Sequence, residues 1–156
     1  MRDAAFRLAF AVGLGIVLVD QLTKNWARDT FQDGSVEVIG SWLRFRYSEN
    51  PGAAFSSFTG SGQVIAVIGV GVIGFLVFLI SRTTRGIELV ALGLILGGAL
   101  GNLIDRIFRG TGVLDGAVVD WIDWWFIPTF NVADAALNVG VAVLLIAALL
   151  FPESHD

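Results

Sequence analysis

The sequence predicts an all-α membrane protein with four transmembrane helices, a small extramembrane β-sheet and an interfacial loop. Of its 156 residues, 55% are hydrophobic and 15% are charged, whereas about 25% of residues are charged in ordinary soluble domains. The mean hydropathy is +0.76, and the apolar residues gather in four long stretches. A chain this short cannot bury so much apolar surface in a water-soluble core. We therefore expect residues 1–156 to form a single integral-membrane domain.

The four apolar stretches predict spans at about 4–26, 62–81, 87–106 and 131–151. A helix needs about 20 mostly apolar residues to cross the hydrocarbon core of a bilayer, and each stretch fits once its polar flanks are counted. The first stretch, with Arg2 and Arg7, is also similar to a secretory signal peptide. No small-x-small cleavage site follows it, so we expect this span to be retained.

Four spans place both termini on one side of the membrane. Lysine and arginine are enriched in cytoplasmic loops, but the count of basic residues does not favour a cytoplasmic N-terminus. Four lie on the terminal side and six on the other: Arg2, Arg7, Arg82 and Arg85 against Lys24, Arg28, Arg44, Arg46, Arg106 and Arg109. The two arginines in the tight 81–86 turn do favour it. We therefore expect both termini to be cytoplasmic.

The segments between the spans have two different patterns. Residues 42–47 alternate apolar and basic side chains, which predicts a strand with one apolar face in a small sheet at the membrane surface. The segment 109–130 contains several glycines and a group of tryptophans. Tryptophan is enriched at the level of the lipid headgroups, so this segment is expected to be an interfacial loop.

Charged side chains inside a spanning segment are costly and indicate function. Five lie near helix ends on the same side of the membrane: Asp20, Lys24, Asp105, Arg106 and Asp134. Each also has an ordinary explanation. Asp20 and Lys24 have the i,i+4 spacing of an ion pair, Arg106 can snorkel, and a carboxylate in a first helical turn suits the helix dipole. Their convergence predicts a polar pocket at the interface, open to the non-cytoplasmic side.

Two further segments combine small residues with an asparagine. Residues 50–55, which begin Asn-Pro-Gly, predict a turn, either a plain loop or a place where another backbone approaches closely. Residues 97–102 place three glycines on the third span, a pattern typical of close helix packing. Asn102 at the end of this run needs a hydrogen-bond partner at membrane depth.

The composition limits the possible chemistry. The chain has no cysteine, and its only histidine is His155, so we expect neither a His-based triad nor a metal site, and no cofactor. The net charge of −4 argues against nucleic acid as a partner. Carboxylates are the best-supplied reactive groups. Two that lie close together share a proton, so that one acts as a general base and the other as a general acid.

Four blocks, in order along the chain, resemble the bacterial lipoprotein signal peptidases, also called signal peptidase II. The blocks are 20–24 (DQLTK), 50–55 (NPGAAF), 98–106 (GALGNLIDR), and 118–120 (VVD) with 130–134 (FNVAD). The resemblance implies an aspartic endopeptidase of the bacterial cytoplasmic (inner) membrane. Its site would lie near the outer membrane–water interface, with the interfacial loop on the periplasmic side. It would remove the signal peptide from diacylglyceryl-modified prolipoproteins, cutting just before the lipidated cysteine.

The resemblance also implies roles for individual residues. Asp120 and Asp134 would be catalytic. Supporting or substrate-binding roles fall on Asp20, Lys24, Asn50, Gly101, Asn102, Arg106, Asn131 and Ala133. Among these, we expect Asn131 to orient a carboxylate or the substrate backbone, and Asn102 and Arg106 to hold substrate carbonyls or a catalytic carboxylate. Asp20 and Lys24 would brace the site. Partners are then the prolipoprotein and membrane lipid, and we expect a monomer.

The chain departs from the family pattern at several places. The segment 109–117 is longer than the family's compact loop, Trp121 replaces an expected Phe, and Ala135 replaces a common Ser. Asp115 and Asp123 are additional carboxylates. Asp123 is the stronger rival for a catalytic role because it lies three residues after Asp120.

Two alternatives to a peptidase remain at this stage. Charged residues at span ends also occur in a small membrane transporter or in a subunit with a proton or ion pathway, although no inverted repeat is evident. A purely structural subunit would tolerate neutral replacements at the polar positions.

Overall fold

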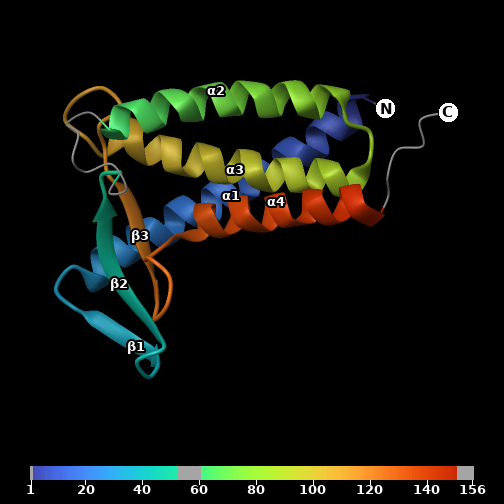
Figure 1. Cartoon of the computed structure of the whole chain (residues 1–156). Coiled ribbons are helices and arrows are strands. Elements are labelled where there is room, and N and C mark those ends of the chain that lie inside the picture. Colours follow the sequence, from blue (N-terminus) through green and yellow to red (C-terminus); the bar gives the residue numbers. More distant parts are fainter. Residues whose placement is uncertain (1, 53–60, 151–156) are drawn as a thin grey trace.

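The computed structural model describes residues 2–52 and 61–150. Its helices are α1 (Arg2–Phe31), α2 (Ser61–Arg82), α3 (Gly86–Phe108) and α4 (Val132–Leu150). They lie alongside one another, and α1 begins at the end of the bundle where α4 ends (Figure 1). All four are long and apolar enough to cross a membrane, over Phe6–Phe31, Gly62–Arg82, Gly86–Phe108 and Val132–Leu150. The predicted fold class is confirmed, and α1 continues several residues beyond its predicted end.

Helix α3 lies at the centre of the bundle and packs closely through its glycines. A Cβ atom at Gly93 would lie 2.6 Å from the carbonyl oxygen of Ala9, and one at Gly97 would lie 2.6 Å from that of Gly13. The absence of a side chain therefore lets α1 and α3 approach each other. On the other side, a Cβ at Gly140 of α4 would lie 2.6 Å from Ile95. These contacts confirm the predicted close packing of the third span.

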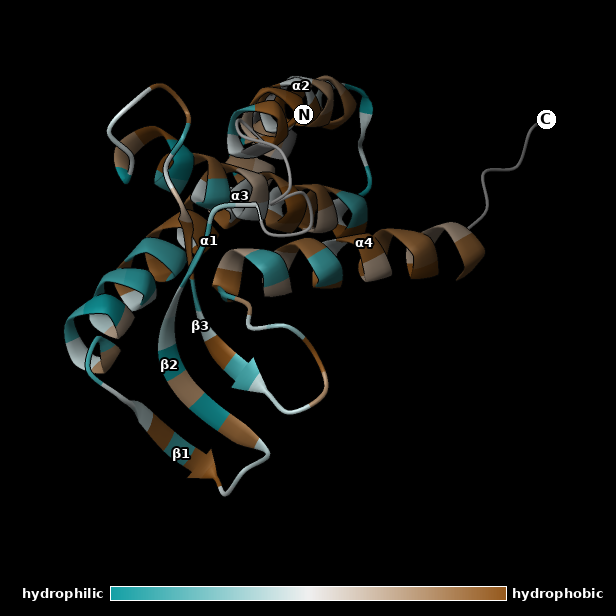
Figure 2. Cartoon of the chain, turned by 60° about the vertical axis from the view of Figure 1, so that its left-hand side comes forward, coloured by the Kyte–Doolittle hydropathy of each residue, from teal (hydrophilic) through white to brown (hydrophobic). Residues whose placement is uncertain are grey.

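The outward faces of the helices are apolar. Phe75 and Val64 on α2 are each 59% exposed, and Leu145 on α4 is 61% exposed. Figure 2 shows α2 mostly in hydrophobic colours, and α4 likewise beyond the hydrophilic bands near its start. In water such surfaces would be unfavourable, whereas lipid solvates them.

A three-stranded antiparallel sheet projects from the end of the bundle where α1 ends and α4 begins (Figure 1). Its strands are β1 (Ser35–Ile39), β2 (Leu43–Asn50) and β3 (Val118–Trp124), in the order β1-β2-β3. The predicted strand is present as β2. The expectation that residues 118–124 belong to a loop is wrong. They form β3 because they pair with β2 along its length, from Leu43 opposite Trp124 to Asn50 opposite Val118.

Aromatic side chains pack the sheet against α1. The ring centroid of Trp26 lies 4.9 Å from that of Phe31, 6.0 Å from Phe45 and 5.4 Å from Trp121, each in an edge-to-face arrangement. Such pairs stabilise by about 0.5–1.5 kcal/mol beyond the area they bury. They hold β2 and β3 next to the ends of α1, α3 and α4, where the polar residues gather.

Candidate active site

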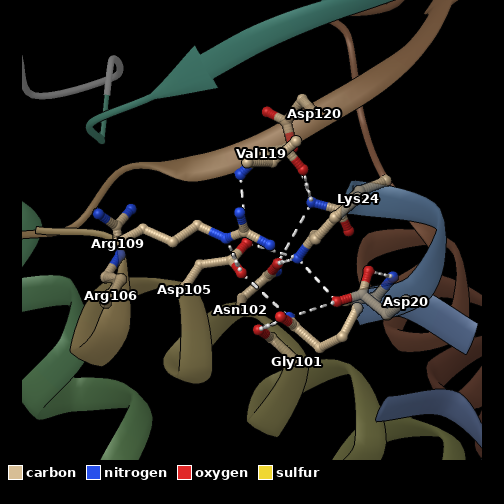
Figure 3. A network of polar contacts seen from close by, with 12 residues as sticks. Asp20, Lys24, Gly101, Asn102, Asp105, Arg106, Arg109, Val119 and Asp120 are labelled. Carbon is tan, nitrogen blue, oxygen red and sulfur yellow. Dashed lines mark hydrogen bonds and ion pairs between the residues drawn. The ribbon is translucent and has the colours of Figure 1, made fainter. Parts of the chain in front are cut away.

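The polar residues singled out by the sequence meet where the sheet joins the bundle. The buried polar and charged side chains are Asp20, Lys24, Asp105, Arg106, Asp120, Asp123 and Asn131. They come from α1, α3, β3 and the residue before α4, and most lie within one network of contacts (Figure 3). Of the turn predicted at residues 50–55, the structure describes residues 50–52; residues 53–55 lie outside the described residues.

The centre of the network is a buried cation, Lys24. Its Nζ lies 2.8 Å from an oxygen of Asp20 and 2.8 Å from one of Asp105, and all three side chains are fully buried. Nζ also donates to Asn102 Oδ1 at 3.0 Å. A second cation, Arg109, lies 2.8 Å from the other oxygen of Asp105. Two carboxylates therefore face two cations, and this part of the site is neutral.

Gly101 and Ala133 support the network by being small. A Cβ at Gly101 would lie 2.6 Å from Asp20 Oδ2 and 3.2 Å from the Cβ of Ala133. The carboxylate of Asp20 occupies the space this leaves, and its Oδ1 accepts a hydrogen bond from the backbone N–H of Ala133 at 2.9 Å. Asp20 thus ties α1 to the first turn of α4.

Asp120 lies on β3 and is 3% exposed. Its two oxygens accept hydrogen bonds from Asn131 Nδ2 at 2.7 Å and Asn50 Nδ2 at 3.1 Å. Asn50 is itself oriented by the backbone N–H of Gly52, which donates to Asn50 Oδ1 at 2.9 Å. Burial, followed by the negative charge of Asp134, raises the pKa of Asp120 from 3.8 to about 6, although the two amide hydrogen bonds oppose this.

Asp134 lies in the first turn of α4 and is partly exposed. Asn102 Nδ2 donates to its Oδ1 at 2.8 Å. Asn131 and Asp134 also cap the helix reciprocally. Asn131 N donates to Asp134 Oδ2 at 3.3 Å, and Asp134 N donates to Asn131 Oδ1 at 2.9 Å. This is the pattern of a capping box, with Asn131 in place of the usual Ser or Thr and Asp134 in place of the usual Glu or Gln.

Two asparagines join the aspartates to each other and to the buried cluster. Asn131 Nδ2, which contacts Asp120, also lies 3.2 Å from Asn102 Oδ1. Asn102 in turn contacts both Lys24 and Asp134. Within the described ranges, no cation forms an ion pair with Asp120 or Asp134. They are two interacting carboxylates held by amides, an arrangement suited to sharing a proton.

Arg106 is 5% exposed and faces a cavity. Its NH1 donates to the carbonyl oxygen of Gly116 at 3.1 Å. The cavity, of about 260 Å³, lies between α2, α3 and α4, and Asn102 and Arg106 are the two polar residues in a lining that is otherwise apolar or glycine. The structure thus brings Arg106 to the cavity next to Asn102.

The rival carboxylates lie elsewhere. Asp123 Oδ2 lies 2.7 Å from Arg44 and 3.1 Å from Arg46. Successive side chains of a strand point to opposite faces, so residues 120 and 123 face apart. Asp115 accepts hydrogen bonds from the backbone N–H of Gly112 within its own loop. In the part of the chain that the structure describes, neither contacts Asp120 or Asp134.

Two members of the network, Gln21 and Arg109, were not predicted to belong to the site, whereas Asp105 was one of the five charged residues expected in the polar pocket. Both donate to Asp105 Oδ1, Gln21 through Nε2 at 3.0 Å and Arg109 through Nε at 2.8 Å. The position of Asp105 at the end of a span indicated a functional residue, but the sequence did not show which residues it bonds. Among residues 2–52 and 61–150, no three His, Cys, Asp or Glu side chains are grouped to hold a metal ion.

The fold and the site define a multi-pass membrane protein with an acidic polar site at one end of its helix bundle. The sequence model of the family described as signal peptidase (SPase) II matches residues 12–150. The chain belongs to this family, and it is a protease. The transporter alternative is thereby set aside.

Individual relatives agree with this assignment. The chain is 44% identical to a lipoprotein signal peptidase of Rhodococcus jostii over 92% of its own length and 74% of that protein. It is 40% identical to one of Mycolicibacterium smegmatis over 96% of its length and 64% of that protein.

Two solved structures, each described as a bacterial membrane enzyme, share the fold. They superpose with TM-scores of 0.80 and 0.78 at 32% and 30% identity. The matches cover 93% and 95% of this chain, and 94% and 91% of the solved chains.

Proposed function

We propose that Asp120 and Asp134 are the catalytic pair with which this signal peptidase removes signal peptides from prolipoproteins. The observation that supports the pair most directly is that, among the described residues, it has no counter-ion. Both carboxylates contact asparagines, and Asn131 contacts both. Every other buried carboxylate of the junction, Asp20, Asp105 and Asp123, has a cation within 2.8 Å.

The pair supplies what peptide hydrolysis needs. The two carboxyl groups share one proton. The ionised carboxylate removes a proton from a water molecule while the water oxygen bonds to the scissile carbonyl carbon. The protonated carboxyl donates to the carbonyl oxygen and stabilises the tetrahedral intermediate. When the C–N bond breaks, a proton passes to the leaving nitrogen. We assign the shared proton to the pair, because strongly coupled groups titrate together.

The apolar cavity next to the pair supports a substrate of mixed character. A signal peptide and the acyl chains of a diacylglyceryl-modified cysteine are apolar, whereas the bond to be cut is polar. Asn102 and Arg106 are the polar part of the cavity lining, and Asn102 contacts Asp134. We propose that they hold substrate carbonyls there, and that the chain is cut just before the lipidated cysteine.

The remaining supporting residues act through this arrangement. Asn50 and Asn131 orient Asp120, while Asp20 and Lys24 brace α1 against α3 and α4. Gly101 and Ala133 leave the room that Asp20 needs. We further propose that the protein works as a monomer in the bacterial cytoplasmic (inner) membrane, surrounded by lipid. Both termini would be cytoplasmic, because α1 begins and α4 ends at the end of the bundle opposite the site (Figure 1).

The test is cleavage of a diacylglyceryl-modified prolipoprotein by the purified protein in detergent. Asp120→Asn and Asp134→Asn should each lower kcat by about 10³-fold, because loss of general acid–base catalysis has that size. Asp123→Asn is the matched control, since it also neutralises a carboxylate on β3 but one that pairs with arginines. It should stay within a few-fold of the wild type.

Other outcomes would contradict the proposal. An inactive Asp123→Asn beside an active Asp120→Asn would move the catalytic role to the other face of β3. A wild-type protein that cuts the unmodified precursor as fast as the lipidated one would refute the proposed lipid requirement.

A further inference from the structure

Asp105 is buried, and among the described residues its carboxylate forms no hydrogen bond or ion pair with Asp120 or with a residue that lines the cavity. Its Oδ2 lies 2.8 Å from Lys24 Nζ and accepts a hydrogen bond from the backbone N–H of Val119 at 3.2 Å. Its Oδ1 accepts from Arg109 Nε at 2.8 Å and from Gln21 Nε2 at 3.0 Å. Figure 3 shows the carboxylate between Lys24 and Arg109, below the strand that carries Val119 and Asp120.

The bond to Val119 joins the sheet to α3. Strand β3 is at the edge of the sheet, so the backbone groups on its free side need partners outside the sheet. At Val119, which is fully buried, these partners are specific side chains. The N–H donates to Asp105, and the carbonyl oxygen accepts from Asn131 Nδ2 at 3.3 Å. The two peptide groups on either side of Val119, immediately before Asp120, are therefore held by α3 and by the cap of α4.

The segment before β3 is folded onto the same turn of α3. The backbone N–H of Gly116 donates to the carbonyl oxygen of Arg106 at 3.1 Å, and Arg106 NH1 returns a bond to Gly116 O at 3.1 Å. A Cβ at Gly116 would collide with the carbonyl oxygen of Asp105. β3 thus starts directly over the last turn of α3. From that turn, the Asp105 carboxylate bonds the strand at Val119, next to Asp120.

We propose that Asp105 is a positioning residue: its hydrogen bond to the Val119 peptide sets where Asp120 stands relative to Asp134. The inference rests on the proposed catalytic pair. Asp134 is fixed through the α4 cap, whereas Asp120 is on the sheet. Asn131 bonds the Asp120 side chain and Asp105 bonds the backbone just before it, so the separation of the two carboxylates depends also on how the sheet is docked on α3. Misplacing a reacting group by about 1 Å can lower the rate about 10²-fold.

Two substitutions separate the hydrogen bond from the charge. In Asp105→Asn, the amide oxygen can still accept from Val119 N–H and Lys24, while the NH₂ group faces Arg109 and Gln21. In Asp105→Ala, the bond to Val119 is lost altogether. We expect kcat to fall about 10²-fold in Asp105→Ala and to stay within a few-fold of the wild type in Asp105→Asn, with KM little changed in both.

If Asp105→Ala does not fold, Asp105→Glu tests the same hydrogen bond. It keeps the negative charge between Lys24 and Arg109 but lengthens the side chain by one methylene, which displaces the oxygen that holds Val119. Its kcat should fall well below that of Asp105→Asn. If charge were what mattered, the order of these two variants would be reversed.

The pH dependence of kcat/KM gives a readout that loss of stability alone would not move. The charged and titratable groups acting on Asp120 are Asp134 from α4, Lys24 from α1 and Arg106 from α3. If Asp120 moves away from Asp134 and towards water, both causes of its raised pKa weaken. The alkaline limb should then shift to lower pH in Asp105→Ala. Asp123→Ala, which removes two ion pairs from the same sheet, should leave the limb in place.

The results distinguish the two proposals. If Asp120→Asn is inactive but folded Asp105→Ala has wild-type kcat and an unmoved pH profile, the catalytic pair stands and the positioning role is wrong. A loss of kcat that Asp123→Ala reproduces in full would also overturn it, because general loosening of the sheet would explain both. If Asp120→Asn retains wild-type activity, the catalytic pair itself is wrong.

Discussion

Asp20 and Asp105 lie at the same end of the bundle as Asp120 and Asp134, yet the two pairs have opposite surroundings. The first pair is fully buried and shares one lysine, with Nζ 2.8 Å from each carboxylate. The second pair contacts asparagine amides instead. Amides donate hydrogen bonds but carry no charge, so they hold a carboxylate in place without pairing its negative charge with a positive one.

The difference shows how neighbouring carboxylates acquire different roles. A buried carboxylate paired with a cation joins structural elements, and removing its partner is strongly destabilising. A carboxylate that lacks a cation and faces another carboxylate holds its proton to higher pH, as Asp120 does with a pKa of about 6. Perturbed pKa values of this kind are typical of catalytic groups.

The largest effect on stability is expected from Lys24→Met. The change leaves Asp20 and part of Asp105 without their shared cation, and breaking a buried ion pair costs about 3–5 kcal/mol. Thermal unfolding in detergent measures the loss. Arg28→Met is the control, since Arg28 lies one turn further along α1 and its ion pair with Asp29 is exposed; it should change the stability by less than about 0.5 kcal/mol. Equal effects of both changes would show that the Lys24 cluster is not structural.

Gly101→Ala should have a smaller effect. The added Cβ would lie 2.6 Å from Asp20 Oδ2, and overpacking of this kind costs about 1–3 kcal/mol. Gly74→Ala on α2 is the matched control, because a Cβ there meets nothing within 4 Å. It should be neutral or stabilising by up to about 1 kcal/mol. Thermal unfolding compares the two, and a Gly101→Ala protein as stable as Gly74→Ala would mean that Asp20 does not need this space.

The smallest expected effect is a shift of the pH profile. Asp120 loses its proton as the pH rises through about 6, so kcat/KM should fall there on the alkaline side. The Asn50 hydrogen bond lowers the pKa of Asp120, so Asn50→Ala should raise it and move this limb to higher pH by about half a unit to one unit. Asn25→Ala, at an exposed amide that bonds Arg109, should not move it. A shift to lower pH in Asn50→Ala would contradict the assigned role of Asn50.

The sequence by itself determined the membrane-spanning frame, because hydropathy over a stretch of residues is a local property and lipid is the solvent that it suits. It also determined the Asp20–Lys24 pair, whose i,i+4 spacing brings the side chains together on any helix. The residues proposed as catalytic came from the resemblance of four blocks to a known family, and no spacing argument alone singled them out.

Only the tertiary structure decided what depends on contacts between distant segments. Residues 118–124 form a strand because β2 is there to pair with them, and Asp123 is separated from Asp120 by the alternation of that strand and by two arginines of β2. The partners of Asp105, on α1, directly after α3 and at the start of β3, follow from how the sheet docks on the bundle. Such partners are set by packing in three dimensions, which local residue patterns do not encode.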